Sequence, residues 1–339
     1  MDMYHSVVRL STSFLCLFMV AFSLCGQSKN VAKTDTIQSF ADKIIIKANI
    51  DTQTDVYSLR SDNSTDLKIR PNQNYKTYLS LDYEFIGVSI GFVPSFIGAN
   101  DDDDLKGSSS FSDIQFRFFF GNWVQQLQYK KIKGYYVENT GDFLPGWNEG
   151  TDPYFTIPNL TNTLYGLSTA YVLNPKFSYR NVLYQTEWQK KSAGSFIPTL
   201  FYNLQKYAFT LADTASLEDN YNVRFAASYY YTLVIHQHWF ISPHVSPSAG
   251  IRFVTTETST DGLKAKETET LFSRSVEGGV QVGYSSERWI FGGRFNFRAS
   301  WVNESKNTVT ENDQLYGLFY VGYRFDAPRF ISSLMQRLK

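Results

Sequence analysis

The chain contains only two cysteines, Cys16 and Cys25, and both lie near its start. Residues 1–26 have the layout of a secretory signal peptide. Arg9 precedes the short apolar run LCLFMVAFSLC, and small residues follow from Gly26 onward. Cleavage near Gly26 would leave an exported chain without cysteine. Disulfides are therefore excluded as the source of its stability, and another device must hold the fold together.

Long apolar runs are also scarce. The run in the predicted signal peptide is shorter than the roughly 20 residues that a membrane-spanning helix needs, and no later segment approaches that length. A helical membrane anchor is therefore not expected. Cys25 suggests a lipid-anchored alternative, which is disfavoured because Leu24 stands where lipoprotein processing needs a small residue.

The sequence has no excess of either charge, with 32 Lys and Arg against 32 Asp and Glu. Because a basic excess is missing, no nucleic-acid partner is expected. Aromatic residues, in contrast, make up 17% of the chain, although the mean hydropathy is negative. This combination is typical of a transmembrane β-barrel, whose strands turn one face to lipid and the other to a polar lumen. We therefore expect the cell outer membrane as the location.

The run RWIFGGRFNFRASW at 288–301 shows this pattern most clearly. Successive side chains of a strand point to opposite faces, so one face carries Trp289, Phe291, Gly293, Phe295, Phe297, Ala299 and Trp301. The other face carries Arg288, Ile290, Gly292, Arg294, Asn296, Arg298 and Ser300. A soluble sheet also alternates, but this apolar face is unusually aromatic and similar runs recur along the chain.

The recurring runs predict about twelve strands, joined alternately by short turns and long polar loops. The predicted strands are 43–60, 75–85, 88–92, 114–120, 123–133, 165–173, 177–189, 221–234, 239–253, 276–284, 288–301 and 315–325. Short turns are predicted at 86–87, 121–122, 174–176, 236–238 and 285–287, and the loops include 190–221 and 255–269. Bacterial outer-membrane barrels have even strand counts, short periplasmic turns and long outer loops. Ten or fourteen strands stay open as alternatives, because 196–210 resembles a strand interrupted by Pro198.

The expected organisation is an all-β protein with a closed antiparallel transmembrane β-barrel. Its parts are a signal peptide at 1–26, a periplasmic segment at 27–42, the barrel at 43–325 and a short periplasmic tail at 326–339. The last strand ends in Tyr323 and Phe325, as recognition by the barrel-assembly machinery requires. Phe330, Ile331 and Leu334 have nearly helical spacing, which is compatible with a short helix or with a plug of the barrel.

Three stretches carry a family resemblance: LKIRPNQNYKTYLSLDYEF at 67–85, YKKIKGYYVEN at 129–139 and KFSYRNVLYQTEWQKKSAGSF at 176–196. The third is the most specific, through KFSY at 176–179 and QKKSAGS at 189–195. They resemble the domain-of-unknown-function family 4421, exported proteins of Gram-negative bacteria that are taken to be outer-membrane barrels. The resemblance extends over most of the mature chain. It implies a barrel and carries no catalytic assignment.

Charged side chains gather on the predicted lumen face. The candidate cluster, which includes one histidine, is Asp82, Glu84, Asp113, Arg117, Glu187, His244, Arg252, Glu277, Arg294, Arg298 and Arg324. Charges outside bulk water must be paired or hydrogen-bonded, so the simplest hypothesis is that they fill the barrel. The alternative is a polar passage or a binding site for an anionic solute. Barrels of about eight strands are filled and those of about sixteen hold a channel, so twelve predicts a narrow or occluded lumen.

Metal and cofactor sites are not expected. His236 and His238 have a spacing that suits a metal in principle, but no nearby Cys, Asp or Glu completes a ligand set. The acidic run at 101–104 suggests calcium or a cation bridge to lipopolysaccharide. Its spacing is not that of an EF-hand loop, which favours a solvated loop.

The sequence favours a structural role or a narrow, porin-like passive passage for small polar solutes. Expected partners are outer-membrane lipid and lipopolysaccharide, the assembly machinery and, for a passage, a small polar solute. An outer-membrane lipid hydrolase is one alternative, with His244 as base and Ser192, Ser195 or Ser246 as nucleophile. His244 is predicted to face inward and no GxSxG elbow occurs, so no enzyme is expected. A secreted glycan-binding β-sandwich is the second alternative.

Overall fold

The computed structural model describes residues 35–336, except 55, 62–63, 212–213, 303–309 and 312–313. The predicted signal peptide at 1–26 and the first part of the segment 27–42 lie outside the described residues.

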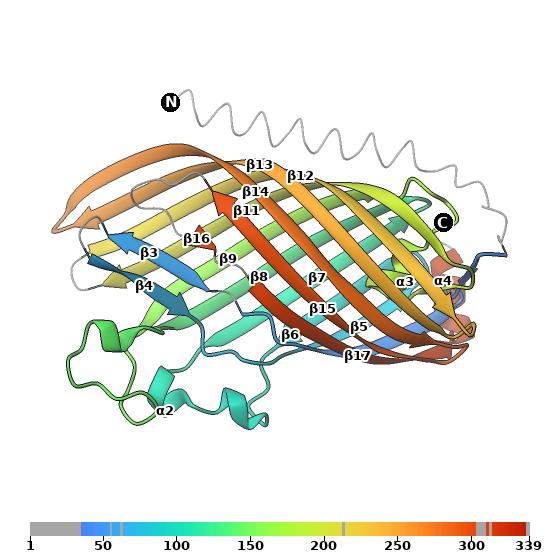
Figure 1. The fold of residues 1–339 in the computed structure, drawn as a ribbon, viewed down its shortest axis with the longest axis horizontal. Helices are drawn as coiled ribbons and strands as arrows, with labels where there is room; N and C mark the ends of the chain where they lie inside the picture. The colour runs from blue at the N-terminus through green and yellow to red at the C-terminus, as the bar shows by residue number, and fades with distance from the viewer. Residues whose placement is uncertain are drawn as a thin grey trace.

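Among the described residues, twelve antiparallel strands form a closed wall in which β17 pairs with β2 (Figure 1). In wall order they are β2 (Lys43–Asp51), β5 (Lys76–Tyr83), β6 (Ile86–Phe92), β7 (Ser110–Phe120), β8 (Trp123–Val137), β9 (Thr156–Tyr171), β11 (Ala193–Leu211), β12 (Thr214–Ile235), β13 (Trp239–Thr260), β14 (Leu263–Ser285), β15 (Trp289–Val302) and β17 (Gln314–Asp326). The predicted all-β class and closed twelve-stranded barrel are confirmed. The β-sandwich alternative is wrong, because the first and last strands of the wall pair with each other.

The remaining elements are not strands of the closed wall. They are β1 (Ile37–Ser39), β3 (Tyr57–Ser61), β4 (Ser64–Arg70), β10 (Glu187–Gln189), β16 (Thr310–Glu311), the 3-10 turns η1 (Gly98–Asn100) and η2 (Thr140–Asp142), and the helices α2 (Asp103–Lys106), α3 (Tyr179–Leu183) and α4 (Arg329–Gln336). Of these, β4 pairs with the end of β8. Within the described ranges, no helix is both long enough and apolar enough to span a membrane.

The connections give the barrel two distinct ends. At the turn end, short turns such as Glu84–Phe85 and Gly121–Asn122 join the wall strands. At the loop end lie the β3–β4 hairpin and the loop with α2, on the opposite side of the molecule from α3 and α4 in Figure 1. Outer-membrane barrels keep their short turns in the periplasm and their long loops outside.

The outer surface of the wall is apolar and aromatic. On β15, Phe295 is 53% exposed whereas its inward neighbour Asn296 is 6% exposed, as the alternation predicts. Aromatic pairs occur towards the turn end, where the rings of Trp289 and Tyr323 lie 4.8 Å apart between centroids. A closed wall with this outer face suits the lipid phase of a bilayer, so the predicted outer-membrane location is confirmed.

The prediction of a strand at 177–189 is wrong. These residues form α3 and β10, and β10 pairs with β1 rather than with the wall. The twelfth wall strand is instead β11, the stretch that contains Pro198. β11 pairs with β9 only from Thr199 onward, so the proline lies just outside that pairing, where a missing N–H is tolerated.

Three connections also differ from the prediction. The turn expected at 86–87 lies at Glu84 and Phe85, where Glu84 adopts a φ of +52°. The expected loops at 190–221 and 255–269 are the hairpins β11–β12 and β13–β14, the second of which turns at Asp261 and Gly262. Residues 255–269 resemble a loop in the sequence because β13 and β14 carry polar side chains on both faces there. The β11–β12 hairpin resembles a loop because Pro198 interrupts the alternation of β11.

Candidate functional site in the barrel lumen

The segment 172–192 joins β9 to β11 and folds into the lumen at the turn end; we call it the plug. Ser178 caps the start of α3, because its hydroxyl accepts a hydrogen bond from the Asn181 N–H at 2.8 Å. Gln189 in turn accepts from the Ser178 N–H at 2.6 Å. Since β10 pairs with β1, the N-terminal segment is attached to the plug.

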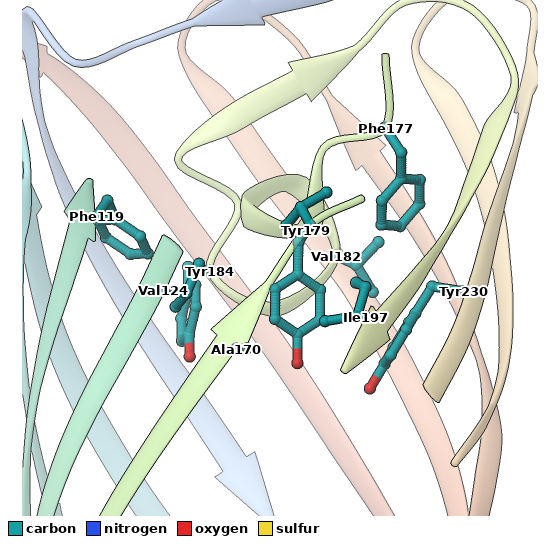
Figure 2. Close-up of a cluster of buried hydrophobic side chains, with 10 residues drawn as sticks. Phe119, Val124, Ala170, Phe177, Tyr179, Val182, Tyr184, Ile197 and Tyr230 are labelled. Atoms are coloured by element: carbon teal, nitrogen blue, oxygen red, sulfur yellow. The ribbon is translucent and has the colours of Figure 1, made fainter. Parts of the chain in front are cut away.

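Apolar side chains fix the plug to the wall. The buried cluster combines plug residues with inward wall residues: Phe119, Val124, Ala170, Val172, Phe177, Tyr179, Val182, Tyr184, Ile197 and Tyr230. Figure 2 shows that the hydroxyls of Tyr179, Tyr184 and Tyr230 point in the same direction, away from α3. The cluster thus closes the turn end with an apolar layer that turns tyrosine hydroxyls towards the middle of the lumen.

Cations of the wall bind the end of α3. Three of them donate to plug carbonyl oxygens: Arg294 Nη2 to Val182 at 2.5 Å, Lys47 Nζ to Tyr184 at 3.0 Å and Arg324 Nη2 to Gln185 at 2.9 Å. The last carbonyls of a helix lack partners within the helix, so these donors satisfy groups that would otherwise be buried alone. The predicted lumen charges Arg294 and Arg324 therefore hold the plug.

Arg324 joins the plug, the wall and the N-terminal segment. Its side chain has no exposed surface, and it also donates to Ser286 O and, at 3.1 Å, to Ser285 Oγ. The guanidinium carbon lies 3.9 Å from the centroid of the Phe40 ring. A cation in this position can remain buried because neighbouring oxygens and an aromatic face surround it.

Asp82 and Arg117 form a buried ion pair beside the plug. Arg117 Nη2 lies 3.1 Å from Asp82 Oδ1, and both residues are at most 4% exposed. The Arg117 guanidinium also lies 5.0 Å from the ring centroid of Tyr184. Burial raises the pKa of Tyr184 to about 12, so its hydroxyl stays neutral and donates to Gln126 at 3.0 Å.

Glu187 lies in the plug and not on the wall, so its predicted placement is wrong. The alternation that suggested a wall strand runs from the end of α3 through the three-residue strand β10. Glu187 accepts from the Ser178 hydroxyl at 2.6 Å and lies 3.6 Å from Arg180 Nη1. Burial lowers the pKa of Arg180, while the Glu187 carboxylate raises it. Arg180 also lies 4.1 Å from the Phe119 ring centroid, which binds α3 to β7.

A polar cavity of about 310 Å³ occupies the lumen between the plug and the loop end; we call it the chamber. Its wall comes mainly from β8, β9 and β11 to β15 and presents amides and hydroxyls, among them Gln128, Asn203, Asn220, Asn222, Ser273 and Ser275. The lining cations include Lys130, Arg224, Arg252 and Arg298, and no Asp or Glu of the described residues lines it. The chamber therefore presents positive charge and neutral polar groups.

The chamber cations differ in their partners. Arg298 Nε donates to Glu277 Oε1 at 2.7 Å, and Arg224 donates to the hydroxyls of Ser248 and Ser275, each at 3.2 Å. Arg252 has neither an ion pair nor a hydrogen bond from its side chain among the residues that the structure describes. Of the predicted cluster, Arg252, Glu277 and Arg298 thus gather at or beside the chamber.

The other predicted residues have separate surroundings. Asp113 faces inward and accepts from Tyr78 at 3.2 Å and from Gln128 at 2.8 Å. His244 faces inward and stacks on Tyr230, with ring centroids 4.8 Å apart. Glu84 does not continue the lumen face of β5, because it occupies the turn; its carbonyl oxygen accepts from Arg180 at 3.1 Å. In the described part of the chain, no group of three or more His, Cys, Asp or Glu side chains is arranged to hold a metal.

Sequence reasoning missed the plug and three cations, Lys47, Lys130 and Arg224. The outward residues Ile46 and Ala48 flank Lys47, so alternation alone could have placed it in the lumen. For the plug, the available signal was Ser178, a residue type that is favoured at the N-cap of a helix.

A second apolar cluster bounds the chamber at the loop end. It consists of Tyr57, Ile69, Ile132, Tyr135, Val137, Ile157, Leu160 and Tyr207, and it joins the β3–β4 hairpin to the wall. Beside it is a cavity of about 230 Å³, lined mainly by aromatic and Thr or Ser side chains together with Glu218. Apolar layers thus lie on both sides of the chamber along the barrel.

Solved structures with similarity to the chain have low identity and low scores. The β domain of the Bordetella autotransporter BrkA is 10% identical, with 84% of this chain and 100% of that chain covered and a TM-score of 0.35. The outer membrane protease OmpT from Escherichia coli is 8% identical, with coverages of 86% and 97% and a TM-score of 0.32. The ferric citrate transporter FecA is 9% identical with a TM-score of 0.34; 82% of this chain matches 42% of FecA, less than half its length.

No curated protein sequence matches the chain. The family model described as Domain of unknown function (DUF4421) matches residues 33–325, which include the plug and all wall strands except the last residue of β17.

Proposed function

The protein belongs to the DUF4421 family, and from this premise we propose that it is an outer-membrane passage for small anionic solutes, closed by its plug. The chamber carries the proposal, because Lys130, Arg224, Arg252 and Arg298 line it without a lining carboxylate among the described residues. Rings of Arg and Lys favour anions in a pore, and low-dielectric walls strengthen their field.

The plug makes passage conditional. It occupies the turn end through an apolar cluster and hydrogen bonds, and no cysteine lies in the described part of the chain to fix it covalently. Its ends continue into β9 and β11, so it can leave the lumen without separating from the barrel. A solute that crosses the protein requires this displacement.

A purely structural barrel is the second candidate. Its support comes from the wall cations beside the plug, which we call the plug layer: Lys47, Arg117, Arg294 and Arg324. Each is hydrogen-bonded to protein oxygens or ion-paired, as a permanently filled lumen requires. The hydrolase alternative has no comparable support. His244 faces the lumen, and no hydrogen bond joins it to a serine among the described residues.

Replacing residues 175–191 by a short Gly-Ser linker tests the passage. In a planar bilayer we expect the intact protein to conduct little and the shortened protein to conduct with a preference for anions, measured as the reversal potential in a salt gradient. Heat-modifiable migration on a gel would show that the shortened barrel folds. A folded but sealed variant, or one that prefers cations, would contradict the proposal and favour the structural role.

Lys130 and Lys131 provide a matched pair within the shortened barrel. Lys130 lines the chamber, whereas Lys131 is exposed on the outward face of β8. Lys130→Gln should lower the anion preference, and Lys131→Gln should leave it unchanged. Equal effects would mean that the preference does not arise in the chamber.

A further inference from the structure

The chamber wall offers buried hydrogen-bond acceptors as well as cations. Asn220 is 4% exposed, and its Nδ2 donates to Glu218 Oε1 at 2.7 Å. Its Oδ1 is buried and has no hydrogen-bond partner among the described residues, and the same holds for Asn222 Oδ1 on the same inward face of β12. Buried polar atoms are normally satisfied, so these two amide oxygens indicate the place of a donor supplied from outside the chain.

A third unpartnered atom lies two strands away. Ser273 on β14 is 7% exposed, and its buried hydroxyl has no partner within the described part of the chain. It lines the chamber together with both asparagines. A hydroxyl can donate or accept, so this position suits a ligand hydroxyl as well as an anionic oxygen.

Arg252 completes the group. The strand register sets Arg252 of β13 directly beside Asn222 of β12, and both line the chamber. The opposite charges of Glu218 and Arg252 attract each other, but the two side chains form no ion pair. The guanidinium is therefore available to an anionic group, which it binds best through two parallel hydrogen bonds.

These groups together define a ligand chemistry. The two amide oxygens accept from O–H or N–H donors, and the Ser273 hydroxyl, which can donate or accept, suits a ligand hydroxyl. The neighbouring guanidinium favours an anionic oxygen. A cavity of about 310 Å³ exceeds the size of a simple inorganic anion and lies at the lower limit of small-molecule sites. An apolar molecule would leave the buried polar atoms unsatisfied.

We propose that the chamber binds a hydroxyl-rich anion of about the size of one sugar unit, namely a sugar acid or a sugar phosphate. The anionic group binds Arg252, and ring hydroxyls donate to Asn220 and Asn222. The proposal rests on the proposed function in so far as both assign the chamber to anions. It adds the hydroxyl requirement and the residues that meet it.

Calorimetric titration of the full-length protein in a neutral detergent tests the ligand class. The probes are glucuronate, glucose 6-phosphate, glucose, acetate and inorganic phosphate. We expect glucuronate or glucose 6-phosphate to bind at least about tenfold more tightly than glucose and than the anion without hydroxyls. The tighter of the two identifies the anionic group. Absence of binding by both, or equal binding by acetate and glucuronate, would overturn the proposal.

Variants locate the site. Arg252→Gln should weaken binding of the sugar anion by about tenfold and leave glucose unaffected, whereas Asn220→Leu should weaken both sugars. Lys131→Gln on the outward face is the matched control and should change neither. If Arg252→Gln binds the sugar anion as the wild type does, the assignment is wrong; Asn220→Leu gives an independent test should Arg252→Gln fail to fold.

This experiment is separable from the conductance test, because binding is measured with the plug in place. Anion-selective conductance without sugar-anion binding would overturn the ligand class alone. Binding without conductance in the shortened barrel would overturn the passage alone.

Discussion

The plug layer and the chamber both carry Lys and Arg on the inward face of the wall, yet the partners of these side chains differ. Arg294 and Arg298 lie four residues apart on β15; Arg294 donates to the plug, whereas Arg298 lines the chamber and is paired with Glu277. In the plug layer, Lys47 and Arg324 both donate to main-chain oxygens, whereas Arg252 in the chamber has no partner among the described residues. The difference teaches that partners, rather than residue type, separate charges that build the barrel from charges available to a solute.

The largest effect is expected where a buried pair of the plug layer is broken. Arg117→Met removes the partner of Asp82, which is 1% exposed, and should cost about 3–5 kcal/mol of unfolding free energy. Urea unfolding of the barrel in lipid vesicles, followed by tryptophan fluorescence, measures this. The double variant Asp82→Asn with Arg117→Met should recover most of the loss, because neither member of the pair then stays buried as a lone charge. A single variant as stable as the wild type would mean that the ion pair does not support the barrel.

A smaller effect is expected from loosening the plug. Arg294→Gln shortens the side chain that donates to Val182 O, at a cost of about 1.5–3 kcal/mol for a hydrogen bond from a charged donor. Amide hydrogen exchange in 179–183 should accelerate by about tenfold or more, because α3 opens more often. Arg298→Gln, on the same strand but in the chamber, should leave exchange in α3 unchanged. Similar acceleration in both variants would remove the distinction between the two layers.

The smallest effect on stability is expected in the chamber. Arg252→Gln should change the unfolding free energy by less than about 0.5 kcal/mol, because no ion pair or hydrogen bond of the described residues is lost. The same unfolding measurement tests it. A loss as large as that in Arg117→Met would show that Arg252 is structural and would remove its role in solute binding.

The wall strands could be predicted from the sequence because the side chains of a strand alternate between the lipid face and the lumen face. The alternation around Phe295 and Asn296 depends only on which face meets lipid, and it correctly predicted that the aromatic side chains of β15 are exposed and that Ile290 and Asn296 are buried. The inward placement of Arg294 and Arg298 followed from the same rule. Their partners did not, because Val182 lies more than a hundred residues away from Arg294 in the chain.

The plug was not predicted because the alternation of residues at 182–189 suggests a two-faced strand, whereas the polar Gln185 and Gln189 are buried as well. Val182, Tyr184 and Trp188 are buried through contacts with the lumen wall and the N-terminal segment, not through a place in the wall. Only the tertiary structure distinguishes a plug segment from a wall strand, since the wall groups that bind the plug come from strands distant in the sequence. Pro198 added to the error by making β11 resemble an interrupted strand.

The plug also has a consequence for assembly. Lys47 lies on β2 and Arg324 on β17, the two strands whose pairing closes the barrel, and Lys43 joins Asp326 across this seam at 2.7 Å. Both buried cations donate to plug oxygens, so the segment 172–192 bridges the seam from inside. The contacts that close the barrel and those that fill its turn end therefore share Lys47 and Arg324, and we expect the two to form together.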